Sequence, residues 1–162
     1  MMKPFKILAG VFLLMVTGLT ISGCNFGKTS EESRVSLVQS VNPEPAAVEG
    51  NKGNGLKTAE KVKKDIQAMP AIFDVAVIKG EKEILVAYKV KHMQRFQMKK
   101  IEKEINQKLE KNYPKETFIV SSDFKIFIEA IELKEKVKEN TYSKKRAEKQ
   151  LQKIIKLKKE LT

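Results

Sequence analysis

The stretch IFDVAVIKGEKEILVAYKVK, residues 72 to 91, decides the fold of this 162-residue chain. On both sides of Gly80, apolar residues alternate with others at the period of two that is typical of a β-strand. Gly80 itself, followed by Glu81 and Lys82, is suited to a tight turn. The pattern predicts an antiparallel hairpin. The residues that we expect on one face of it are Phe73, Val75 and Val77 in the first strand and Ile84, Val86, Tyr88 and Val90 in the second.

Three amphipathic helices and a third strand surround the hairpin. Apolar residues recur at helical spacing before it, up to Pro70, and after it, up to Pro114. TFIVSS (117 to 122) predicts a strand, and Asp123 is placed to cap a helix behind it. The order α-β-β-α-β-α predicts an α+β fold, a small two-layer sandwich with its helices on one face of the sheet. The apolar helix positions are Ala59, Val62, Ile66 and Met69, then Met98, Ile101, Ile105 and Leu109, then Phe124, Phe127, Ile128 and Ile131.

Composition divides the chain into segments. Seven of the eight glycines lie at or before position 55, which marks a boundary between a linker and a folded domain. Within the linker, RVSLVQSV (34 to 41) is semi-apolar; we expect it to be mostly disordered, with a short strand as the alternative. The predicted segments are a signal peptide (1–23), an acylated cysteine with a flexible linker (24–55), a small α+β domain (56–135) and a basic C-terminal helix (136–162).

The N-terminus has the pattern of an export signal. Lys3 and Lys6 are followed by an almost wholly apolar stretch from Ile7 to Val16. That stretch is shorter than the roughly 20 residues of a membrane-spanning helix. It suits the apolar region of a signal peptide, about 7 to 15 residues long. The segment ends in Ile21-Ser22-Gly23-Cys24, which contains the only cysteine of the chain.

Those four residues resemble the lipobox of bacterial lipoproteins. The resemblance implies that Cys24 is linked through sulfur to diacylglycerol, and that a signal peptidase recognises Ile21, Ser22 and Gly23 and cuts before Cys24. The new N-terminal amine would then be acylated, typically with palmitate. Two or more acyl chains hold a protein on a membrane stably, whereas one binds marginally. The alternative is a plain signal peptide, or a short uncleaved anchor, with an incidental cysteine.

The chain is strongly basic. Its formal net charge is +12, and removal of residues 1–23, with two lysines and no acid, would leave +10. Residues 134–162 hold 11 Lys or Arg and 4 Asp or Glu. They predict an amphipathic helix capped by Ser143, whose polar side could contact anionic lipid or a wall polymer; docking on its own domain is the alternative. We expect no nucleic acid partner for an exported chain. The candidate polyanion contacts are Lys145, Lys149, Lys153 and Lys156.

The sequence predicts no catalytic site, no cofactor and no metal. Cys24 would be consumed as a thioether, and with one histidine, His92, the chain lacks the residues of a usual zinc site. A single cysteine also excludes an internal disulfide. We expect His92 to be solvated or to cap a helix, Asp123 to cap a helix, and Glu129 and Glu132, one helical turn apart, to lie on a solvated face.

Taken together, the lipobox, the Gly/Asn/Pro-rich linker and the element order resemble the YhcN/YlaJ-type sporulation lipoproteins. DVAVIKGEKEILVAYKV (74–90) is similar to that family's Val-Ala-Val strand and to its next strand with a central alanine, here Ala87. SSDFKIFIEAI (121–131) is similar to its last strand-to-helix step. The resemblance covers about residues 1–138. It implies a non-enzymatic, lipid-anchored protein of the spore or cell membrane with a role in sporulation or germination.

Two alternatives remain open beside this function. One is a tethered module that binds a polyanion, and the other is an assembly factor of a membrane complex. The sequence predicts membrane lipid as a partner through Cys24 and identifies no protein partner.

Overall fold

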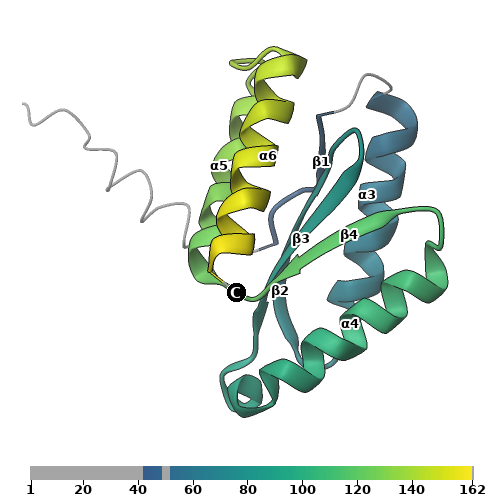
Figure 1. The fold of residues 1–162 in the computed structure, drawn as a ribbon. Helices are drawn as coiled ribbons and strands as arrows, with labels where there is room; N and C mark the ends of the chain where they lie inside the picture. The colour runs from purple at the N-terminus through teal and green to yellow at the C-terminus, as the bar shows by residue number, and fades with distance from the viewer. Residues whose placement is uncertain (1–41, 49–51, 162) are drawn as a thin grey trace, which may run out of the picture. The chain divides into compact units, whose positions relative to one another are not determined.

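The computed structural model describes residues 42–48 and 52–161, which fold around one sheet (Figure 1). The predicted order of elements, including the C-terminal helix, is confirmed, and the structure adds a short strand before it and a 3-10 helix after the hairpin. The elements are β1 (Ala46–Ala47), α3 (Lys52–Gln67), β2 (Ile72–Lys79), β3 (Glu83–Val90), the 3-10 helix η1 (His92–Gln97), α4 (Met98–Asn112), β4 (Thr117–Ser121), α5 (Phe124–Lys138) and α6 (Lys144–Glu160).

The hairpin that the sequence predicts lies at the centre of the sheet. The described strands follow the order β1-β2-β3-β4, with β2 and β3 antiparallel and Ala76 opposite Ala87. The turn closes through a hydrogen bond of 2.9 Å from the Gly80 amide to the Glu83 carbonyl. The two outer strands run parallel to their inner neighbours. Because parallel neighbours need a crossover, α3 and α4 make those connections.

Helices cover both faces of the sheet. The mixed α/β class is confirmed, but the prediction of a two-layer sandwich with helices on one face is wrong. In β2, Val75 and Val77 pack with α3 and α4, whereas Ala76 and Ile78 pack with α5 and α6. Both faces of the hairpin therefore carry apolar side chains, so each face needs its own layer of helices. Figure 1 shows the pair α5 and α6 on one side of the sheet and α3 with α4 on the other.

A β-bulge changes which residues of β2 point inward. The pairing with β3 shifts between Ile72 and Asp74, so that the alternation is interrupted at Phe73. One extra residue in a strand reverses the facing of the residues before it. Ile72 therefore joins Val75 in the core, while Phe73 is 49% exposed. The prediction that Phe73 shares the buried face of Val75 is wrong.

The folded part is longer than predicted at both ends. The predicted linker runs to residue 55, but residues 42–48 lie along β2, where Ala46, Ala47 and Val48 are buried, and α3 begins at Lys52. At the other end, α6 supplies buried side chains to the same core as α5, so the segment 136–162 is part of the domain. The stretch 34–41 lies outside the described residues.

Candidate functional site

The predicted lipobox, Ile21, Ser22, Gly23 and Cys24, lies outside the described residues, and its lipidation stays a prediction. Among the described residues, Asn42 is bound to the central hairpin. The backbone amide of Asn42 donates a hydrogen bond of 3.2 Å to Oδ1 of Asp74, near the start of β2.

The four candidate lysines of the tail lie on a helix that docks on its own domain. Ser143 caps α6, as predicted, by accepting a hydrogen bond of 3.4 Å from the Arg146 amide. The apolar side of α6 is buried against α5 and the sheet, so it is not available to a membrane. Lys145, Lys149, Lys153 and Lys156 are all exposed on the opposite side. Their contact with a polyanion therefore stays a prediction that would have to rest on charge alone.

The other polar residues singled out from the sequence have local roles. His92 is exposed at the start of η1, as expected. Asp123 caps α5, as predicted, because its Oδ1 accepts a hydrogen bond of 3.0 Å from the Ile126 amide. Glu129 and Glu132 are half-buried, so the prediction of a solvated face is wrong for them.

A buried ion pair joins β2 and β3. The Asp74 carboxylate has no exposed surface, and Lys89 Nζ lies 3.3 Å from its Oδ2. Oδ1 accepts hydrogen bonds from the amides of Asn42 and, at 2.9 Å, Val75. Burial of one charge without a partner is strongly destabilising, whereas a paired and hydrogen-bonded charge is tolerated. The Asp74 carboxylate therefore holds Asn42 against the sheet.

Two aromatic rings enclose the lysine of this pair. Lys89 Nζ lies 4.4 Å from the ring centroid of Phe127. It lies 5.5 Å from the ring centroid of Phe73. Both separations are within the range of a cation–π contact. The sequence contains a signal for this pair that the prediction above did not use. Asp74 lies inside an apolar strand, and Lys89 lies opposite it in the hairpin register.

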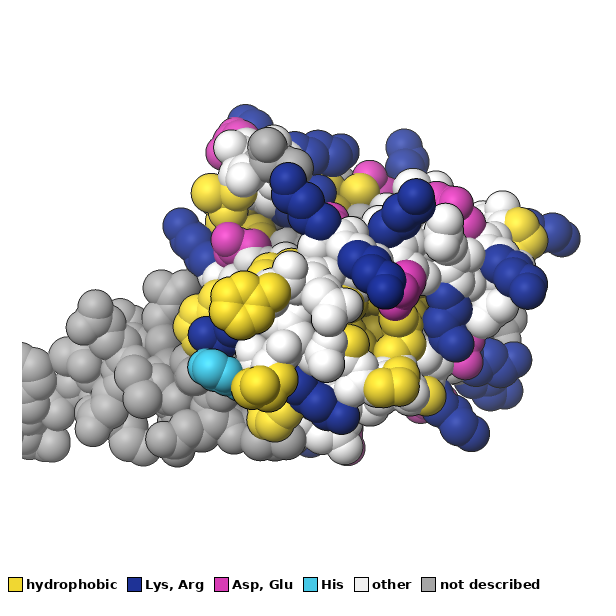
Figure 2. All heavy atoms as spheres, turned by 90° about the horizontal axis from the view of Figure 1, so that it is seen from below, with side chains coloured by type: hydrophobic (Ala, Val, Ile, Leu, Met, Phe, Trp, Pro, Cys, Tyr) yellow, Lys and Arg dark blue, Asp and Glu magenta, His cyan; other side chains and the backbone are white. Residues whose placement is uncertain are grey.

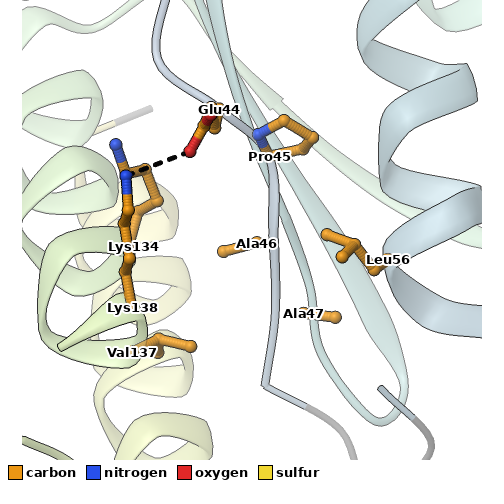
Figure 3. A pocket seen from close by; sticks show the side chains of 8 residues that line it. All are labelled: Glu44, Pro45, Ala46, Ala47, Leu56, Lys134, Val137 and Lys138. Atoms are coloured by element: carbon orange, nitrogen blue, oxygen red, sulfur yellow. Dashed lines mark hydrogen bonds and ion pairs between the residues drawn. The ribbon is translucent and has the colours of Figure 1, made fainter. Parts of the chain in front are cut away.

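A hollow of about 240 Å³ lies beside β1, between the extended segment and α5 (Figure 3). Apolar side chains form much of its wall, and Lys138 Nζ reaches across it to Oε2 of Glu44, at 3.2 Å. The hydrogen bond from Lys138 and its charge hold the pKa of the Glu44 carboxyl below its usual value. On the other side of residues 42–48, Lys63 of α3 donates a hydrogen bond to the carbonyl of Pro43. Burial lowers the pKa of the Lys63 ammonium group. These contacts attach residues 42–48 to the two flanking helices.

The family model described as "Sporulation lipoprotein YhcN/YlaJ" matches residues 32–141. The chain belongs to this family. The match spans the hairpin, α4, β4 and α5, and ends before α6. A search of curated proteins and a search of solved structures found no significant match.

In this sporulation lipoprotein, exposed hydrophobic side chains collect at one end of the sheet. Phe96 is 98% exposed and Met93 is 81% exposed, both in η1. Phe73 and Phe124 are about half exposed, as is Leu161 at the end of α6. We refer to these five residues as the apolar end. Figure 2 shows hydrophobic side chains on this side of the molecule beside the single histidine, with Lys and Arg around them.

In the part of the chain that the structure describes, no helix is both long enough and apolar enough to cross a bilayer. Within the same residues, no three or more His, Cys, Asp or Glu side chains lie close enough together to hold a metal ion.

Proposed function

We propose that this sporulation lipoprotein is anchored by acylated Cys24 on the extracytoplasmic face of the spore or cell membrane. There it has a non-enzymatic, structural or interaction role in sporulation or germination. The observation that carries the proposal is membership of the family together with Ile21-Ser22-Gly23-Cys24 behind a short apolar segment.

Three described aspartates support a non-enzymatic role because each has structural partners. Asp123 is occupied as a helix cap, and Asp74 is bound to two backbone amides and one ammonium group. Asp65 accepts hydrogen bonds from Asn112 and from the hydroxyl of Tyr113, which join α3 to the end of α4. Each of these three side chains therefore has a role in holding the fold together.

The acyl anchor is tested by changing the lipobox in a spore-forming host. Cys24→Ala should leave uncut precursor or release the protein from the membrane fraction, because the thioether cannot form. Ser22→Ala is the matched control, since it keeps a small residue before the cut site and should leave the mature, membrane-bound form unchanged. Mass spectrometry of the native N-terminal peptide should show a diacylglyceryl and N-acyl cysteine. An unmodified Cys24 in membrane-bound protein would overturn the anchor.

The role in sporulation or germination is tested separately by following a tagged copy through growth and spore formation. We expect it to appear in spore membranes and a deletion strain to sporulate or germinate abnormally. Equal abundance in vegetative cells, with normal spores from the deletion strain, would refute this part and favour one of the two alternative functions.

A further inference from the structure

We propose that the apolar end is an interfacial membrane-contact surface: η1 enters the headgroup region of an anionic bilayer with Phe96 and Met93, while surrounding cations contact lipid phosphates. The proposal is independent of any enzymatic or partner-binding role. It extends the proposed function from an anchored chain to a domain with a fixed face toward the membrane.

The exposure of these side chains is the first argument. Among the six large hydrophobic residues that the described chain exposes, only Leu56 lies outside the apolar end. Single exposed hydrophobic residues are ordinary, but several gathered on one surface indicate a binding face. Phe96 and Met93 bury almost none of their surface in the fold, so they contribute little to it.

The strand register shows that the five residues belong to one end. Ile72, at the start of β2, pairs with Val90 at the end of β3, and η1 follows two residues later. Ala87 near the end of β3 pairs with Ser121 at the end of β4, just before α5. The last residue of this group, Leu161, lines a hollow of about 380 Å³ together with Phe124 and Met98, and so closes the surface between α4, α5 and α6.

Charge selects an anionic bilayer as the occupant. Between Glu83 and Glu102 the chain carries five Lys or Arg and no acid. Four of these cations lie in or beside η1 and are exposed: Lys91, Arg95, Lys99 and Lys100. A cation near an anionic bilayer contributes favourable binding, and apolar side chains between such cations add a term that salt does not screen. The hollow beside Phe124 is also lined by Glu102 and Asp123, so the acid-free, cationic part of the surface is η1 with the residues on either side of it.

Vesicle binding tests the surface without the anchor. The protein is the chain from residue 24 to 162 carrying Cys24→Ala, and the vesicles contain equal parts of phosphatidylglycerol and phosphatidylcholine. Because the chain has no tryptophan, Phe96→Trp supplies a reporter in η1, and Lys153→Trp supplies the matched reporter on α6. We expect a blue shift and quenching by brominated lipid for Phe96→Trp, and neither for Lys153→Trp.

Substitution then separates the apolar and the charge contributions. Met93→Ser with Phe96→Ser should lower partitioning about tenfold or more, because two side chains lose burial, with an unchanged thermal melt. Lys145→Gln with Lys149→Gln forms the control, which removes two cations near the start of α6, away from Leu161 at its other end, and should change partitioning less than about threefold.

Four outcomes would overturn the proposal. Equal binding by the Met93/Phe96 double variant would leave the apolar end without a role. A larger loss from the α6 control would assign binding to charge on α6, and full competition by soluble polyglycerol phosphate would indicate a polymer ligand. A blue shift without vesicles that grows with protein concentration would instead assign the surface to a second copy of this chain. A failure here leaves the acyl anchor untouched, since that is measured by the Cys24 modification.

Discussion

Gly80→Ala should destabilise the domain by forcing α6 away from the hairpin. A Cβ on residue 80 would lie 2.5 Å from Cδ2 of Leu151 and 3.0 Å from Oε2 of Glu148, both on α6, and 3.1 Å from the Glu83 carbonyl oxygen. Real Cβ atoms essentially never approach a carbon at 2.5 Å, so Leu151 must move by about an ångström. Its side chain has no exposed surface, so it has to move within the packed core.

The magnitude follows from overpacking a filled core. An extra methyl group in such a place typically costs about 1 to 3 kcal/mol. The same turn also has a hydrogen bond of 3.2 Å from the Glu81 amide to Glu148, which the displacement of α6 would weaken. For a net stability in the ordinary range of roughly 5 to 15 kcal/mol, the variant should stay folded but unfold at clearly lower urea concentration.

A double-mutant cycle with Leu151→Ala provides the decisive measurement. Leu151→Ala alone should cost about 2 to 5 kcal/mol because it opens a cavity. In that background the new methyl group fills part of the cavity, so Gly80→Ala should cost at least about 1 kcal/mol less than in the natural chain. Urea unfolding followed by circular dichroism gives all four values. An equal cost of Gly80→Ala in both backgrounds would refute the packing of α6 against this turn.

Two further predictions concern buried polar groups. Lys89→Ala should cost about 3 to 5 kcal/mol by leaving the Asp74 carboxylate, which has no exposed surface, without its ionic partner, and Asp74→Leu combined with Lys89→Met should lose less. Urea unfolding checks both, and an equal loss would contradict a coupled pair. Burial raises the pKa of Tyr88 to about 12, above its unfolded value of about 10. The folded state therefore keeps the phenol proton longer, so stability is unaffected by Tyr88 below about pH 10 and falls between about pH 10 and 12, by at most about 2 to 3 kcal/mol. Tyr88→Phe should remove that part of the decline, and a phenolate absorbance that appears fully near pH 10 would contradict the shift.

Alternation and helical spacing predicted the order of the central elements because those signals depend on neighbouring residues. They did not predict the layering. Ala76, Ile78, Leu85 and Ala87 are apolar like Val75 and Val77, so both faces of the hairpin are buried. A strand that is apolar on both faces indicates a layer of helices on each side of the sheet. Together with α5, α6 forms one of these two layers. The bulge at Phe73 was not predictable from alternation, since it changes the register without changing the residue types.

The candidate sites likewise divide into those that depend on adjacent residues and those that depend on contacts between distant parts of the chain. The cap roles of Asp123 and Ser143 depend on a few adjacent residues and were predicted correctly. The Asp74–Lys89 pair depends on the cross-strand register, and the hollow beside β1 depends on residues 42–48, whose prolines and neighbouring glycines resemble a linker. Small residues such as Ala46 and Ala47 carry little hydrophobic signal, although they are buried beside β2.

This lipoprotein has two basic surfaces, one on α6 and one around η1. They differ in whether exposed apolar side chains lie beside the charges. On α6 the apolar side chains are buried in the domain, so Lys145 and Lys149 can act on a membrane only through their electrostatic field. Physiological salt screens such a field within about 8 Å. The helix ends at Leu161, which belongs to the apolar end. Each helical residue rises about 1.5 Å, so with the apolar end against a bilayer and the helix upright, Lys145 would stand about 24 Å from Leu161.

That height is several screening lengths, which leaves the lysines near the start of α6 without an effective contact. Around η1, exposed cations lie beside Met93 and Phe96, with no acid between Glu83 and Glu102. The net charge alone would favour α6 as the contact, because more lysines lie there. The combination of short-range charge with unburied apolar side chains favours η1 instead.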